Sequence, residues 1–90
     1  MKIHELKTHP IPFQAMKRGE KEFELRFNDR SYRVGDQLLL KEYTPANYWD
    51  REDPKEPEYT GEILHREVTY ILSQYVGLLP GYVILGLKKI

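Results

Sequence analysis

The strict alternation of apolar and polar residues from Glu22 to Asn28 constrains the fold most strongly. The apolar members are Phe23, Leu25 and Phe27, and the polar members are Glu22, Glu24, Arg26 and Asn28. A period of two is typical of a half-buried β-strand, so we expect the apolar side chains to build core and the polar side chains to face outward. The outward row would space Glu24, Arg26 and Asn28 about 6.5–7 Å apart. Such a row can recognise a small polar ligand or one or two nucleotides.

Similar patterns predict further strands and one short helix. We expect strands at residues 1–9, 38–43, 62–72 and 82–87, a helix at residues 11–18, and a resumed apolar alternation at Tyr32 and Val34. The first strand carries one polar group inward whichever of its faces is buried. In the 62–72 strand the apolar phase slips between Ile63 and Val68, which predicts a bulge near His65 or Arg66.

The helix is framed by residues that favour helix ends. Pro10 and Pro12 suit a first helical turn, and Gly19 suits the position after the last turn. Two turns are not stable alone in water, so the helix must dock through Phe13 and Met16. Five to six short strands with one or two short helices predict an α+β fold. We expect a small, partly closed β-barrel, because closing the sheet removes exposed edges.

Length and composition limit the kind of protein. Ninety residues suit one domain over residues 1–90, which buries only about 60–65% of its unfolded surface. The chain has no cysteine, no apolar run long enough to span a membrane and no signal-peptide pattern, so we expect a cytoplasmic protein without membrane contact. The formal net charge is zero, but residues 44–60 carry −3 and the remainder carries +3. This distribution predicts an exposed acidic loop beside a mildly basic body.

Several short motifs follow one another in a defined order. The central one is G-x-K-x-x-E-x-R followed by V-G-D, represented here by Gly19, Lys21, Glu24 and Arg26 and then by Val34, Gly35 and Asp36. Beside it stand H-E-L-K at residues 4–7, N-D-R at 28–30, E-Y at 42–43, T-G at 60–61 and V-T-Y-I-L at 68–72. In this order of motifs the chain resembles the ASCH domain, the activating signal cointegrator homology domain of the PUA-like superfamily. It is most similar to a compact bacterial and phage branch of uncharacterised role.

This resemblance implies a PUA-like barrel with a cleft between the early helix and the barrel, bordered by the motif residues. It also implies binding of RNA or a modified nucleoside, which is the role generally inferred for members of the superfamily. Amidohydrolase members that act on acylated cytidine have a lysine at the Lys21 position, a threonine three residues later and a glutamate on a later strand. Here Glu24 stands in place of that threonine, so the hydroxyl nucleophile of that pattern is missing.

The candidate nucleic-acid-binding residues are Lys21, Glu24, Arg26, Asn28, Arg30, His4 and Lys7. Arg26 can donate two hydrogen bonds to a phosphate or a guanine edge, and Glu24 can accept one from an exocyclic amine. Structural roles are the alternative, with Glu24 and Arg26 as a surface ion pair and residues 28–30 as a turn. If the protein is a small hydrolase instead, the catalytic candidates are Lys21 with Glu24 or Glu42.

The histidines and the aromatic residues of the acidic segment complete the candidates. His4, His9 and His65 lack the spacing of metal ligands, so we expect no metal and no cofactor. Tyr48 and Trp49 lie in the charged loop, where packing in a core does not explain the presence of aromatic residues. They can stack a base, fold back as the anchor of a lid, or contact a protein partner.

Overall fold

The computed structural model describes residues 1–46, 48 and 56–90. These residues contain one helix, α1 (Pro10–Lys17), and five strands. The strands are β1 (Ile3–Thr8), β2 (Phe23–Phe27), β3 (Gln37–Thr44), β4 (Glu58–Ser73) and β5 (Tyr82–Lys89). The helix and the five strands predicted at these positions are therefore present, with their ends shifted by a few residues.

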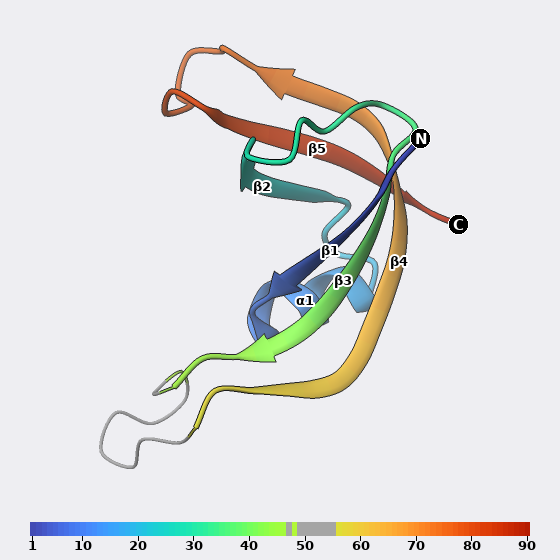
Figure 1. Cartoon of the computed structure of the whole chain (residues 1–90), viewed down its shortest axis with the longest axis vertical. Helices are drawn as coiled ribbons and strands as arrows, with labels where there is room; N and C mark the ends of the chain where they lie inside the picture. The colour runs from blue at the N-terminus through green and yellow to red at the C-terminus, as the bar shows by residue number, and fades with distance from the viewer. Residues whose placement is uncertain (47, 49–55) are drawn as a thin grey trace.

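The strands form one sheet in the order β1-β3-β4-β5-β2. β1 runs parallel to β3, and the other neighbouring strands are antiparallel. The 16-residue strand β4 bends along its length and carries the sheet from β3 round to β5 and β2 (Figure 1). The result is a curled half-barrel with one short helix, which confirms the predicted α+β class and the partly closed barrel.

Helix α1 lies beside β1 and β3 in the hollow of the half-barrel (Figure 1). Phe13 is fully buried and Met16 nearly so, and both belong to the core cluster of buried apolar side chains. The other members come from the inner faces of the strands and from one loop residue: Leu6, Tyr32, Leu38, Leu40, Val68, Val83, Leu85 and Leu87. The predicted docking of the helix through Phe13 and Met16 is confirmed.

The predicted orientation of β2 is wrong. Phe23, Leu25 and Phe27 are about half exposed, whereas Glu24 is buried, with only 4% of its surface accessible to solvent. The register with β5 explains this, because Glu24 pairs with Leu85 and places its side chain on the inner face of the sheet. The polar row of the alternation therefore faces into the half-barrel, and the apolar row faces away from it.

Three further expectations need correction. Residues 32–34 form no strand, and β4 begins at Glu58, within the segment predicted to be a loop. The register of β4 against β5 slips between Val68 and Tyr70, rather than near His65 or Arg66. Val68, before the slip, is buried, and Tyr70, after it, is exposed. Because apolar residues occupy both faces of β4 beyond this point, the pattern alone could not locate the bulge.

Candidate nucleic-acid interface

A hollow of about 310 Å³ opens where β2 approaches the end of β1 and the start of α1. Its lining residues are Lys7, Thr8, His9, Pro12, Lys21, Phe23, Glu24, Leu25 and Arg26. We call it the first hollow. Four of the candidate residues predicted from the sequence, Lys7, Lys21, Glu24 and Arg26, therefore lie around one space.

The buried carboxylate of Glu24 is the centre of the first hollow. Its Oε1 atom accepts a hydrogen bond from Lys21 Nζ at 2.5 Å, and its Oε2 atom accepts one from Arg26 Nε at 3.0 Å. Lys21 Nζ also donates to the carbonyl oxygen of Phe23. A carboxylate can be buried here because two cations and their hydrogen bonds compensate for its lost hydration. The three side chains together carry a net charge of +1.

Arg26 and Arg30 join the two edges of the sheet. Arg26 Nη2 donates to the carbonyl oxygen of Lys7 at 2.7 Å and to Thr8 Oγ1 at 3.1 Å. Arg30 Nη1 donates to the carbonyl oxygen of Glu5 at 3.1 Å. Glu5 and Lys7 belong to β1, which is an edge strand, and the backbone groups on an outer edge need partners other than a neighbouring strand. The two guanidinium groups therefore hold the open side of the half-barrel together.

A second hollow, of about 500 Å³, lies next to the first. It is lined by Glu5, Leu6, Lys7, Arg26, Arg30, Lys41 and Tyr59. Four cations thus surround it with one acid, and that acid is paired with Lys41 Nζ at 2.9 Å. Lys7 and Arg26 line both hollows, so the two hollows meet at these two residues. An anion bound in the second hollow would meet an excess of positive charge.

Sequence reasoning missed two residues of the second hollow, Lys41 and Tyr59. Lys41 lies in a strand whose leucine run predicted burial on both faces, and Tyr59 falls in the segment predicted to be a loop. The pairing of β3 with β4 brings both to the edge of the hollow. A long-range strand pairing of this kind leaves no local signal in the sequence.

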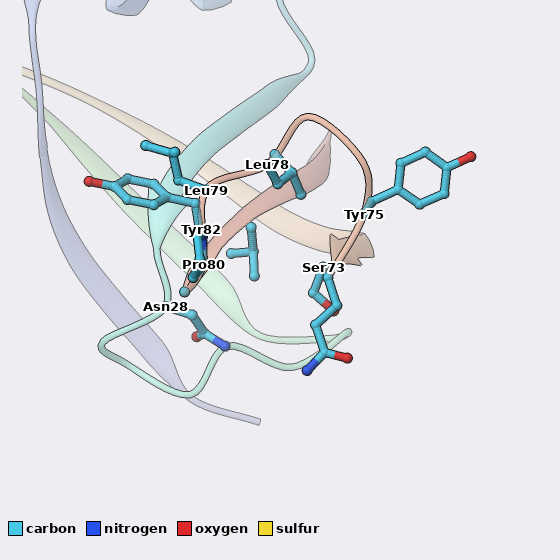
Figure 2. A pocket seen from close by; sticks show the side chains of 10 residues that line it. Asn28, Ser73, Tyr75, Leu78, Leu79, Pro80 and Tyr82 are labelled. Atoms are coloured by element: carbon cyan, nitrogen blue, oxygen red, sulfur yellow. The ribbon is translucent and has the colours of Figure 1, made fainter.

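Three predicted residues lie outside both hollows. His4 is buried, with its Nε2 atom 2.8 Å from Asp36 Oδ2. Asn28 Oδ1 accepts a hydrogen bond from the backbone N–H of Tyr32 at 3.1 Å, as expected of a turn residue. It also lines a separate, largely apolar pocket beneath the β4–β5 connection, shown in Figure 2. Glu42 accepts hydrogen bonds from Gln14 Nε2 at 2.9 Å and from Thr60 Oγ1 at 2.7 Å, a network separate from the contacts of Lys21 and Glu24.

Asp36, the acid of the V-G-D motif, organises the start of the chain. Its carboxylate accepts hydrogen bonds from the backbone N–H groups of Lys2 and Arg33, both at 3.0 Å, besides its contact with His4. Burial alone would raise the pKa of Asp36, but the hydrogen bonds from His4, Lys2 and Arg33 outweigh it and lower the pKa to about 2. The motif therefore anchors β1 to the turn before β3.

Tyr48 docks against the beginning of α1. Its hydroxyl oxygen accepts a hydrogen bond from the backbone N–H of Ile11 at 3.3 Å, and its ring packs edge-on against His9 at 5.4 Å between centroids. His9 lines the first hollow, so Tyr48 lies next to the wall of that hollow. This position corresponds to the alternative in which Tyr48 folds back onto the domain. Trp49 lies outside the described residues, so its predicted roles stay predictions.

Within residues 1–46, 48 and 56–90, no three histidine, aspartate or glutamate side chains gather as a metal site requires. In the same residues, no helix has the length and apolar character needed to cross a membrane.

Two comparisons with known proteins place the chain. A family model described as a domain of unknown function, DUF3850, matches residues 3–87. An uncharacterised 12.9 kDa protein in the GpA 3′ region of Escherichia phage P2 is 39% identical over 51 residues. That alignment covers 57% of this chain but only 47% of the phage protein, so the similarity spans less than half of that relative's length.

Proposed function

Because the chain belongs to the DUF3850 family of domains of unknown function, we propose its role from its own surface, as a non-catalytic module that binds RNA or a modified nucleoside. In this proposal a base or nucleoside occupies the first hollow, and phosphates follow the second hollow along the edge of β1. The observation that carries it is that Lys7 and Arg26 line both hollows, which places the two hollows next to each other.

The first hollow has the chemistry that a nucleobase needs. Phe23 and Leu25 supply apolar surface for the faces of a base, and the Glu24 carboxylate supplies an acceptor for an exocyclic amine. Both oxygens of Glu24 already accept a hydrogen bond, but each carboxylate oxygen has a second lone pair. The cations beside it would bind the acceptor atoms of the same base.

The second hollow supplies the phosphate contacts. Lys7, Arg30 and Lys41 border it together with Arg26, and each is a good donor to phosphate oxygens. Arg26 and Arg30 each donate a hydrogen bond to a backbone carbonyl oxygen of β1. Fewer of their N–H groups are therefore available to phosphates, so the hollow can neutralise only a few of them. We therefore propose weak binding with a modest dependence on salt.

The resemblance to the ASCH domain agrees with this proposal, since Lys21, Glu24 and Arg26 are the motif residues and all three line the first hollow. We extend the proposal accordingly to a PUA-like domain that comprises residues 1–90 and acts in the cytoplasm.

The proposal predicts that short RNA binds at low salt and is released as salt is added. Fluorescence anisotropy with labelled single-stranded and hairpin RNA is expected to give a log-log salt slope of about −1 to −3. The double variant Lys7→Ala, Arg30→Ala removes two proposed phosphate contacts. It is expected to lower the affinity about tenfold and to make the slope shallower by about one to two.

The matched control is the double variant Lys88→Ala, Lys89→Ala, which removes the same charge from the end of β5, outside both hollows. It is expected to bind within about twofold of the unchanged protein. An equal loss in both double variants would show diffuse charge attraction rather than this site. No affinity tighter than millimolar for any RNA or nucleoside at low salt would end the proposal.

One observation favours a hydrolase as the second candidate, namely the direct contact of Lys21 Nζ with Glu24 Oε1 in the first hollow. A lysine and a carboxylate in contact can exchange a proton during the hydrolysis of an amide. The test is to incubate the protein with a panel of acylated cytidines and to measure the released carboxylate. The expected result under the main proposal is no release above the rate of the Lys21→Met variant, whereas Lys21-dependent release would favour the hydrolase.

A further inference from the structure

The face of the sheet that points away from α1 carries a continuous apolar surface at the β4–β5–β2 end. We call it the outer apolar face. It is formed by Tyr70 and Leu72 of β4, Tyr82, Ile84 and Gly86 of β5, and Phe23, Leu25 and Phe27 of β2. Phe23 and Leu25 also line the first hollow, but the inference drawn from this surface does not require that the hollow binds a ligand.

Strand register places these residues in adjacent rows. Tyr70 and Phe23 flank Gly86, and Leu72 and Leu25 flank Ile84. Phe27 lies opposite Tyr82, and their rings pack edge-on with 5.4 Å between centroids. All eight positions are described, and none of the eight holds a charged residue. The inward turn of Glu24 and Arg26 therefore leaves an uncharged face on the outside.

The exposed area of this face is large for so small a chain. Phe23, Leu25, Phe27 and Tyr70 are 46%, 55%, 53% and 63% exposed. Since a large apolar or aromatic side chain has about 150–250 Å² of surface, these four residues alone expose on the order of 400–500 Å². Patches of about 300–600 Å² are the largest found on typical monomers and often mark interaction sites.

The connection between β4 and β5 extends the apolar surface past the end of the strands. Tyr75, Val76 and Leu79 in this connection are all exposed. Tyr75 is one of the residues that line the pocket beneath the connection, and Figure 2 shows its ring extending outward from the other labelled side chains. A partner lying on the outer apolar face could reach this segment as well.

We propose that a second copy of this chain docks on the outer apolar face, sheet against sheet, about a twofold axis. A twofold axis places the same patch of both copies against each other. Because this patch carries no charge, no like charges meet at the interface. The formal net charge of zero removes the long-range repulsion between copies. Two such faces with the neighbouring β4–β5 connection bury about 1,000–1,200 Å², an area typical of weak or transient interfaces. The dimer is therefore weak and dissociates on dilution.

Sedimentation velocity from micromolar to near-millimolar protein, after nuclease treatment, tests this proposal. The unchanged chain is expected to shift from monomer to dimer with concentration, and added salt is expected not to dissociate the dimer, since apolar burial holds it. Tyr70→Lys places a charge on the face and is expected to remain monomeric throughout. Leu25→Lys, on the other side of Ile84, is expected to behave in the same way.

The matched control is Ile63→Lys, which adds the same charge to the same strand at a residue of similar exposure, 53%, outside the outer apolar face. It is expected to dimerise like the unchanged chain. Thermal unfolding of each variant shows whether it is folded. The proposal is overturned if the unchanged chain stays monomeric near millimolar concentration, if Ile63→Lys disrupts association as much as Tyr70→Lys, or if assembly continues beyond a dimer.

Discussion

Replacing Asp36 with alanine is expected to lower the free energy of unfolding by about 3 kcal/mol. The substitution removes the acceptor of two backbone N–H groups, those of Lys2 and Arg33, and the partner of buried His4. A buried donor left without an acceptor costs about 1–3 kcal/mol, so the combined loss is large. Urea unfolding at neutral pH measures the effect as a lower midpoint with an unchanged slope.

Asp36 also makes stability depend on acid. Its pKa in the folded protein is about 2, below the ordinary value of 3.8. The stabilisation is therefore largely present above about pH 4 and is lost as the pH falls towards 2. Linkage gives a loss of about 2 kcal/mol across this window from Asp36 alone.

The variant Asp36→Asn separates the charge from the hydrogen bonds. It is expected to be less stable at neutral pH and to lose less of its remaining stability between about pH 4 and 2 than the unchanged chain. Asp29→Asn, an exposed change in the neighbouring turn, serves as the control and should retain the full acid dependence. An Asp36→Asn protein with the same acid dependence as the control would contradict the assignment.

The sequence reveals the elements of this fold better than their orientation. Alternation in β2 marks two faces but does not say which face is inward, and the apolar face was the natural choice. Here the choice fails because Lys21 and Arg26 neutralise Glu24, which allows the polar face to turn inward beside Val83 and Leu85. Such compensation depends on three-dimensional contacts.

The candidate site shows the same division between local and distant information. Lys21, Glu24 and Arg26 lie within six residues of one another: the strand pattern singled out Glu24 and Arg26, and the G-x-K-x-x-E-x-R motif added Lys21. Asp36 was identified only as the acid of the V-G-D motif, since its partners Lys2 and His4 are more than thirty residues away. Lys41 and Tyr59 were missed for the same reason. Strand pairing between distant segments, rather than any local motif, brings the last residues of the second hollow into place.

Replacing Phe13 with alanine is expected to lower the free energy of unfolding by about 3–5 kcal/mol, the usual cost of removing a fully buried phenylalanine ring. Phe13 has no exposed surface and lies in the core cluster with Leu38 and Leu40. Helix α1 has only eight residues, so it cannot hold its conformation without that contact. Urea unfolding measures the loss of stability.

The same substitution connects the core to the candidate site, because Pro12 of α1 is part of the wall of the first hollow. We expect Phe13→Ala to increase hydrogen exchange throughout α1 and to weaken RNA binding at temperatures where the sheet is still folded. Ile11→Ala, an exposed change on the same helix, should alter stability by no more than about 0.5 kcal/mol. If the two variants lose equal stability, α1 is not held by its buried face, and the wall of the first hollow must be supported in another way.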